Sequence, residues 1–291
     1  MEISIRGLKR VSEFRDVEEL QKEVWGFDNR DLIPIVQLVS ATQVGGVAIG
    51  AFDGDTLVGF VYGFLGSVAG SLVLHSEMLA VRSGYRNLGI GYKLKVAQRE
   101  QVLSQGITHR ITWTFDPLQC RNAHFNFTKL GVVADRYKID FYGEATSSFL
   151  HSNGTDRLWV SWLLDSRRVK ERVEDSSPDV APSMFDGIVP LVRIGPDLLP
   201  QRNSAAERHT EERVLIEVPG DIDTLQQNSP TLASQWREAT RRAFSEQLAA
   251  GYLVEEFCRQ NRNGLKLGVY LLTRRKLADF DGSEDSRAPA V

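Results

Sequence analysis

One stretch of the sequence constrains the fold more than any other, because three different patterns follow one another along it. A mostly apolar run, SLVLHSEMLAV at residues 71–81, comes first, and the turn RNLGIG at residues 86–91 follows it. Apolar residues then recur at helical spacing from Ile90 to Ala97. An apolar strand of this kind is covered on both faces, so the stretch predicts a sheet with helices packed against it.

The glycine-rich turn is a candidate anion site. A turn that opens a helix presents unpaired backbone N–H groups and the positive end of the helix dipole, which favours a phosphate or pyrophosphate. A Walker loop is excluded because no Gly-Lys-Ser/Thr occurs, and a dinucleotide motif is disfavoured because Leu94 stands where its third glycine would be. The alternative is that Gly89 and Gly91 only permit a tight turn.

The rest of the chain adds alternating strand patterns and amphipathic helix patterns. Over residues 1–165 they predict the element order β-α-α-β-β-β-α-β-α-β-β. A helix with Phe14, Val17 and Leu20 on one face and a hairpin about DGD are among its clearest parts. The predicted fold class is α/β, a central mixed sheet flanked by helices with a smaller C-terminal α/β region.

Changes of composition divide the chain into four parts. We expect a first domain at 1–165, a charged and Ser/Pro-rich linker at 166–188, a C-terminal α/β region at 189–279 and a disordered tail at 280–291. Aligned on Gly131 and Gly251, the C-terminal region faintly echoes the first domain, so a degenerate duplicated half is one interpretation. Its Trp236 and the arginines after it predict a core residue beside a solvated face, with anion binding as the alternative.

The composition disfavours several partners. With 42% hydrophobic residues, 25% charged residues and a net charge of −3, the chain resembles soluble globular proteins and gives no electrostatic reason to bind nucleic acid or an anionic membrane. No signal peptide or membrane-length apolar run is seen, which predicts a cytoplasmic location. Cys120 and Cys258 lack the number and spacing for a disulfide framework or a metal site.

The stretch MLAVRSGYRNLGIGYKL resembles the acyl-CoA signature of the GNAT superfamily of N-acetyltransferases, Arg/Gln-x-x-Gly-x-Gly/Ala. Arg86, Gly89 and Gly91 occupy its three defining positions, and RNAHFNFTKLGV resembles a later helix of the superfamily. The predicted element order is also the order of that fold. The resemblance covers about residues 1–165, and with the C-terminal extension the chain is similar to a group of bacterial predicted GNAT acetyltransferases.

The resemblance implies a coenzyme A site. Backbone N–H groups of Leu88 to Gly91 would hold the pyrophosphate with the charge of Arg86 nearby, and the backbone of Met78 to Val81 would pair with the pantetheine arm. Asn122 would hydrogen-bond the pantetheine, with a helix-cap role as the alternative. The expected coenzyme-binding residues are Met78, Leu79, Ala80, Val81, Arg86, Asn87, Leu88, Gly89, Ile90, Gly91 and Asn122.

Two residues are candidates for the base that deprotonates the acceptor amine. The superfamily often supplies this base from the strand before the turn, where this chain has His75 and, two residues later, Glu77. Both side chains should leave the same face of the strand. An ordinary histidine pKa suits a base at neutral pH, whereas a glutamate would need desolvation or a water relay. The sequence leaves the choice between them open.

The acid position departs from the family pattern. The resemblance places a tyrosine where this chain has Phe127, and a phenyl ring has no proton to donate. Cys120 as an acyl-enzyme nucleophile is the weaker interpretation, since no partnering base is apparent. We therefore expect an acetyl-CoA-dependent N-acyltransferase, most simply an acetyltransferase, that needs no metal and acts on a small-molecule amine or amino acid. The alternatives are a catalytically inactive CoA-binding sensor or scaffold and, ranked lower, a protein acetyltransferase. Nothing in the sequence opposes a homo-oligomer.

Overall fold

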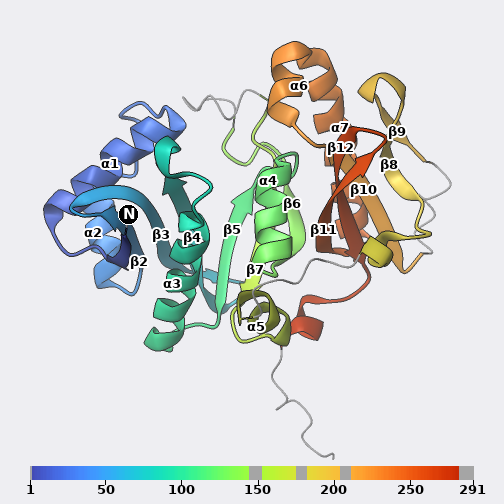
Figure 1. The fold of residues 1–291 in the computed structure, drawn as a ribbon. Helices are drawn as coiled ribbons and strands as arrows, with labels where there is room; N and C mark the ends of the chain where they lie inside the picture. The colour runs from blue at the N-terminus through green and yellow to red at the C-terminus, as the bar shows by residue number, and fades with distance from the viewer. Residues whose placement is uncertain (1, 144–152, 175–181, 204–210, 282–291) are drawn as a thin grey trace, which may run out of the picture. The chain divides into compact units, whose positions relative to one another are not determined.

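The computed structural model describes residues 2–143, 153–174, 182–203 and 211–281. Its elements up to residue 165 follow the predicted order (Figure 1). They are β1 (Ile3–Gly7), α1 (Val11–Trp25), α2 (Ile35–Gln43), β2 (Val47–Asp53), β3 (Thr56–Val68), β4 (Ser71–Val81), α3 (Ile90–Gln105), β5 (Arg110–Phe115), α4 (Cys120–Ala123) with a π-helical continuation (His124–Lys129), β6 (Val133–Lys138) and β7 (Arg157–Leu163). The prediction of a mixed α/β fold is confirmed.

The C-terminal region is also α/β, as predicted. Its elements are α5 (Arg167–Glu174), β8 (Pro190–Ile194), β9 (Pro200–Arg202), β10 (Arg213–Pro219), α6 (Ile222–Asn228), α7 (Pro230–Ala249), β11 (Leu253–Arg262) and β12 (Leu265–Thr273). The chain divides into two compact units, and the division falls after Trp113, inside β5. That division does not coincide with the predicted boundary at residue 165, and the four-part division of the chain stays a prediction.

The first unit is built on an antiparallel sheet with strand order β1-β2-β3-β4, and β5 begins parallel to β4. Helix α1 buries the predicted face of Phe14, Val17 and Leu20, which joins α2 and one sheet face in a single hydrophobic cluster. The helix ends at Gly26, whose left-handed φ of 67° lets its N–H bond the Lys22 carbonyl. Helix α3 packs on the opposite face, where Leu94 approaches the backbone at Gly59.

A bulge interrupts β4 at the residues predicted to be catalytic. Phe64 of β3 pairs with His75 and Tyr62 pairs with Met78, so β4 has one more residue than β3 over this interval. As a result Ser76 faces α3 whereas Met78 faces the cluster under α1 and α2. Gly63 lies opposite the bulge, where an added Cβ would come within 2.8 Å of the His75 carbonyl oxygen. A glycine is needed there because the two strands approach so closely.

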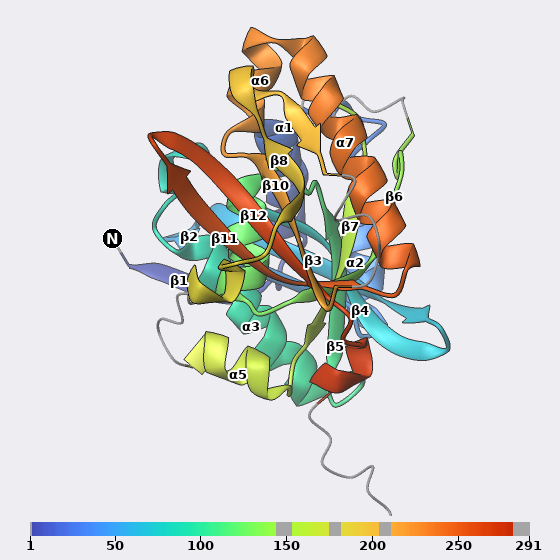
Figure 2. The same cartoon turned by 90° about the vertical axis from the view of Figure 1, so that its right-hand side faces the viewer.

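The second unit contains the strand order β7-β6-β11-β12-β10-β8-β9, with α7 along one face (Figure 2). The β11–β12 hairpin forms around the predicted NRNG turn, and Asn263 and Gly264 adopt left-handed φ values of 52° and 87°. Trp236 of α7 is fully buried and donates its indole N–H to the Leu198 carbonyl, so its predicted core role is confirmed.

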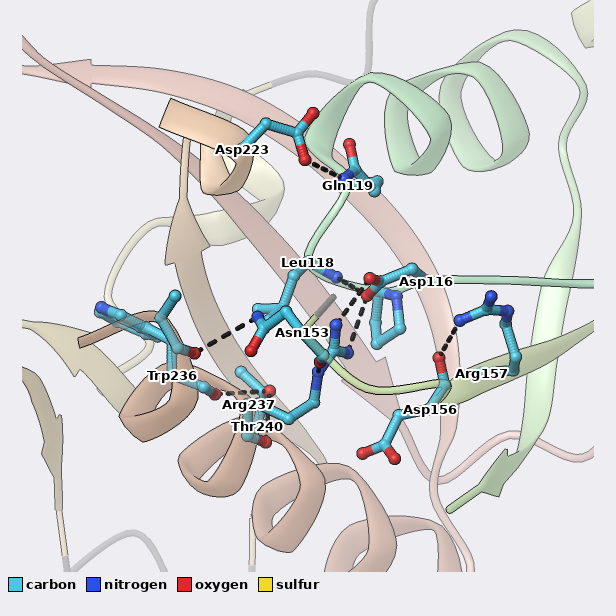
Figure 3. Close-up of polar contacts among 12 residues, drawn as sticks. Asp116, Leu118, Gln119, Asn153, Asp156, Arg157, Asp223, Trp236, Arg237 and Thr240 are labelled. Carbon is cyan, nitrogen blue, oxygen red and sulfur yellow. Dashed lines mark hydrogen bonds and ion pairs between the residues drawn. The ribbon is translucent and has the colours of Figure 1, made fainter. Parts of the chain in front are cut away.

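The arginines that follow Trp236 do not form the predicted solvated face. Arg237 is buried, with both terminal nitrogens bonded to the Asp116 carboxylate at 2.8 and 2.6 Å and its Nε to the Asn153 carbonyl at 2.8 Å (Figure 3). Arg241 bonds the fully buried Asp156. Only Arg242 is exposed. The predicted helix at these residues is present as α7. Its arginine face is not solvated, because aspartates from loops distant in sequence cover it.

Part of the predicted linker is a tightly held helix. Arg168 and Arg172 of α5 both bond Oε1 of Glu256, at 2.6 and 2.8 Å, and Glu256 is buried. Arg168 also bonds the carbonyls of Gly131 and Glu255. Residues 175–181 of the linker and 282–291 of the predicted tail lie outside the described residues. Phe280, at the start of that tail, is buried against Val133, Leu163 and Leu253, so order extends further than predicted.

Candidate active site

The glycine-rich turn is exposed and ends at the first turn of α3. Gly89 is the N-cap residue, with a left-handed φ of 73° and no side chain to cap the helix, and Asn87 before it has a φ of 66°. A Cβ added at Gly89 would meet nothing within 4 Å, while one at Gly91 would make ordinary contacts with Leu79 and Val81. The first N–H groups of the helix therefore open toward unfilled space, which is the geometry an anion requires.

The β4 edge before the turn is also open to a partner. On one edge, residues 78–81 pair with β3. On the other edge, β4 pairs with the parallel strand β5 at two positions, Leu74 with Ile111 and His75 with Thr112. The pairing with β5 ends at His75. The backbone of Met78, Leu79, Ala80 and Val81 thus lies beyond the last pair, where an extended ligand arm could add hydrogen bonds.

His75 and Glu77 come together as predicted. His75 Nε2 lies 3.5 Å from Glu77 Oε2, and His75 Nδ1 lies 3.0 Å from the hydroxyl of Thr112. The neutral ring that fits both contacts carries its proton on Nε2, facing the carboxylate, and accepts from the Thr112 hydroxyl at Nδ1. The side chains are 12% and 24% exposed, so Glu77 is the more accessible of the two.

Burial affects these two groups in opposite directions. Desolvation, with the Lys95 charge as a second cause, lowers the pKa of His75 to about 4. Desolvation raises the pKa of Glu77 above its usual value. A histidine with so low a pKa stays neutral at neutral pH and is a poor proton acceptor, whereas the raised pKa makes Glu77 a stronger base than an ordinary glutamate. Of the two groups, Glu77 is thus the better proton acceptor near neutral pH, with the His75 ring 3.5 Å from its carboxylate.

The low pKa of His75 can be measured directly. In a pH titration of the intact protein followed by NMR, the ring signals of His75 should change with a midpoint at about pH 4. The physical reason is that a charged ring would have to be held in a buried site beside Thr112. His75→Gln assigns the signals. A midpoint near 6.5, the ordinary histidine value, would contradict the assignment of Glu77 as the stronger base.

A buried lysine, which no sequence pattern indicated, supports the bulge from the α3 side. Lys95 is 2% exposed, and its ammonium bonds Ser76 Oγ and Gln98 Oε1, each at 2.9 Å, 3.7 Å from the centre of the Trp113 ring. Burial lowers its pKa well below the usual lysine value. The cluster fixes Ser76, and with it the two flanking residues His75 and Glu77.

Three other residues considered from the sequence lie in the second unit. Phe127 is fully buried and contacts the rings of Phe115 and Tyr270, so it is a core residue and offers no acid. Cys120 is buried with its thiol 3.1 Å from the Pro219 carbonyl, and burial raises its pKa to about 12, which opposes a nucleophilic role. Asn122 is exposed on α4 and takes no part in a cap that the structure shows.

A comparison with protein-family models found a match to part of the chain. Residues 13–131 match the model of the acetyltransferase (GNAT) family, and this span includes the glycine turn, β4, α3 and the helix of Phe127. The GNAT family contains acetyltransferases of several substrate classes, so the family match alone does not define the acceptor. No curated protein matches the chain.

Several solved acetyltransferase structures are similar to a little over half of this chain. They include the ribosomal-protein-S18-alanine N-acetyltransferase of Escherichia coli (11% identity, 56% of this chain and 94% of that one, TM-score 0.44). An aminoglycoside 6'-acetyltransferase type Ii (20%, 57% and 99%, 0.45) and a chain of the NatC complex bound to Gag peptide and CoA (18%, 56% and 99%, 0.44) are also similar. No helix in the described part of the chain is long and apolar enough to span a membrane.

Proposed function

We propose that the GNAT domain transfers an acyl group, most simply acetyl, from coenzyme A to the amine of a small molecule or amino acid. The observation that carries this proposal is the position of Glu77 and His75 at the point where the β4–β5 pairing ends. The unpaired β4 edge and the glycine turn at α3 follow within 14 residues of Glu77. A base, an edge for an extended arm and an anion cradle are thus contiguous.

The residues of the open edge and the turn fit coenzyme A. Backbone N–H groups at the start of α3, from Leu88 to Gly91, would hold its pyrophosphate, with the exposed Arg86 and Asn87 beside them. The backbone of residues 78–81 would bond the pantetheine arm. When bound, coenzyme A supplies an activated thioester carbonyl at the end of that arm.

Glu77 performs the proton transfer in this mechanism. Its carboxylate takes a proton from the acceptor ammonium, directly or through one water, and the neutral amine then attacks the thioester carbonyl. The new C–N bond forms as the C–S bond breaks, and the sulfur leaves as a thiolate that takes up the second proton of the amine nitrogen, directly or through water. The His75 ring, 3.5 Å away through Nε2, would orient the carboxylate, while Thr112 fixes the ring. Because Phe127 is a buried phenyl group, the thiolate leaves without a protein acid at that position.

The proposal is tested by a thiol-release assay on the intact chain that crosses several acyl-CoAs with amino acids, small amines, aminoglycosides and peptides. Acyl-CoA-dependent release with one acceptor class supports transfer and defines the substrate. The second candidate, a CoA-binding protein without turnover, is motivated by Phe127, and it predicts CoA binding with no acceptor-dependent release. A chain that binds no CoA contradicts both. Action on a protein remains the third candidate, which the peptide arm tests, and the cytoplasmic location remains a prediction.

The glycine turn gives a sharper test of coenzyme binding. Gly89→Ala places a Cβ in the open space at the start of α3 and strains a left-handed backbone, so the Kd for CoA should rise about 10-fold or more. Gly84→Ala is the matched control, because Gly84 is also uncrowded and lacks a positive φ. Isothermal titration calorimetry measures both variants. Equal affinities for the two would contradict a phosphate cradle at Gly89.

A further inference from the structure

The second unit contains two antiparallel strand pairs of matching register, β6 with β7 and β11 with β12, which are called hairpins below. In the first, β6 and β7 pair Val133 with Ser161, Ala134 with Val160, Arg136 with Trp159, Tyr137 with Leu158 and Lys138 with Arg157. In the second, β11 and β12 pair Leu253 with Thr273, Val254 with Leu272, Glu256 with Leu271, Phe257 with Tyr270 and Cys258 with Val269. Every β11 residue is 120 positions after its β6 counterpart, and every β12 residue is 112 positions after its β7 counterpart.

The two hairpins share an irregularity as well as a register. The pairing shifts between Ala134 and Arg136 in β6 and between Val254 and Glu256 in β11, which are equivalent positions. A bulge re-aims the strand and is a specific feature, so two independent hairpins would rarely place one at the same point. Each hairpin also follows a helix that ends at a left-handed glycine, Gly131 with φ 74° and Gly251 with φ 87°.

The two hairpins contact each other as if they were related by a local two-fold axis. Strands β6 and β11 are antiparallel, and the residues that face each other are Ala134 and Val254. These two residues are themselves separated by 120 positions, so each lies opposite its own counterpart. That is the arrangement of an isologous interface, in which the same surface is used twice.

The parallel strand pair recurs too. β8 runs parallel to β10 and pairs at Pro190 with Leu215 and at Val192 with Ile216, just as β4 in the first unit runs parallel to β5 at two positions. The segment that joins β8 to β10 differs from the one that joins β4 to β5. Its described residues contain β9 but no helix like the 16-residue α3.

A carboxylate fills the place where β8 and β10 separate. Glu217 of β10 is buried, and its Oε2 accepts the N–H of Ile194 on β8 at 2.8 Å. Arg262 of β11 bonds the same carboxylate and balances its charge. Ile194 is two residues beyond Val192, the last position of β8 that pairs with β10, and on its other edge it pairs with Pro200 of β9. Glu217 thus takes a backbone N–H that a ligand arm would otherwise use.

We propose that residues 190–273 are a second copy of the half-fold at residues 71–163, in which Glu217 fills the gap that receives the acyl donor in the first copy. The second copy has no glycine cradle in its described residues and no open strand edge at Ile194. Each chain therefore binds one coenzyme A, at residues 78–91, and the second copy serves as an intramolecular partner that covers the edge of β6. The binding of one coenzyme A per chain rests on the function proposed above.

The role of Glu217 is tested by hydrogen exchange at the Ile194 amide in the intact protein. In the native chain and in Glu217→Gln, whose amide oxygen still accepts, the Ile194 N–H should stay protected. In Glu217→Ala its exchange should accelerate at least 10-fold relative to neighbouring β8 amides. Retention of native circular dichroism by Glu217→Gln guards against general unfolding. An Ile194 amide whose exchange is unchanged in Glu217→Ala would overturn the filled gap.

The number of coenzyme A molecules bound per chain is tested separately, by the stoichiometry of CoA binding in isothermal titration calorimetry. One CoA per chain is expected, both in the native protein and in Glu217→Ala, and Gly89→Ala should weaken that single site. Two equivalents in the native chain, or one strong equivalent that survives Gly89→Ala, would overturn the assignment of a single site. If no CoA binds, both the proposed function and the single coenzyme site are refuted. The hydrogen exchange of the Ile194 amide still decides whether Glu217 fills the gap.

Discussion

Glu77→Gln is expected to lower kcat by about 10²–10⁴-fold, the usual contribution of a positioned base, while the Kd for CoA changes less than about twofold. The reason is that glutamine keeps the shape and the contact with His75 but cannot take a proton. Steady-state thiol-release kinetics with the acceptor found by the screen measure kcat, and calorimetry measures the Kd. The split between the two quantities separates a catalytic role from a binding role.

Three further variants make the Glu77 result specific. Glu100→Gln removes a carboxylate from the exposed face of α3 and should leave kcat unchanged. His75→Gln should cost less than Glu77→Gln, because His75 orients the base and does not act as the base. The double variant should be no worse than Glu77→Gln alone, since one base is involved. Unchanged turnover in the double variant would refute the assignment of both residues.

Asp116→Asn should destabilise the second unit by about 3–5 kcal/mol, because it leaves a buried guanidinium without its counter-charge. Arg237 is 6% exposed and Asp116 14% exposed, and the pair is bidentate (Figure 3). The same carboxylate accepts the N–H of Leu118, so the turn after β5 would also loosen. Urea denaturation followed by circular dichroism measures the change in the free energy of unfolding.

The matched control for Asp116→Asn uses Arg242 of α7, the helix that also carries Arg237. Arg242→Gln removes an ion pair with Glu246 in which both side chains are well exposed, so its effect should stay below about 0.5 kcal/mol. Equal, small effects for the two variants would show that the Asp116–Arg237 pair does not hold α7 to the loops it touches.

The fold was predictable from the sequence because its signals are local. Apolar periodicity in α1, the DGD turn between β2 and β3 and the glycines that end α1 and α3 specify elements without knowledge of their neighbours. The pairing of His75 with Glu77 could be predicted for the same reason, since it depends on two residues of one strand. The bulge between them could not, because it is defined only by the register with β3.

The remaining features of the site and its surroundings depend on contacts between distant residues. Lys95 reads as an ordinary polar position of a helix, and only the packing of α3 on β4 shows that it is buried against Ser76. The sequence pattern places Arg237 on a solvated face, and only the three-dimensional structure shows that Asp116 lies beside it and that both are largely buried. The identity of the base depends on burial, which reverses the order of the two pKa values expected from free amino acids.

The pairing of β6 with β11 has a practical consequence for anyone who isolates the GNAT domain. A chain cut near residue 165, at the boundary the sequence suggests, would lose β11 and present the β6 edge to solvent. An unpaired strand edge is a template for association with other chains, so the shortened protein would tend to aggregate during expression. It would also lose Glu256, the partner of two arginines on α5. Biochemistry on this protein should therefore begin with the full chain.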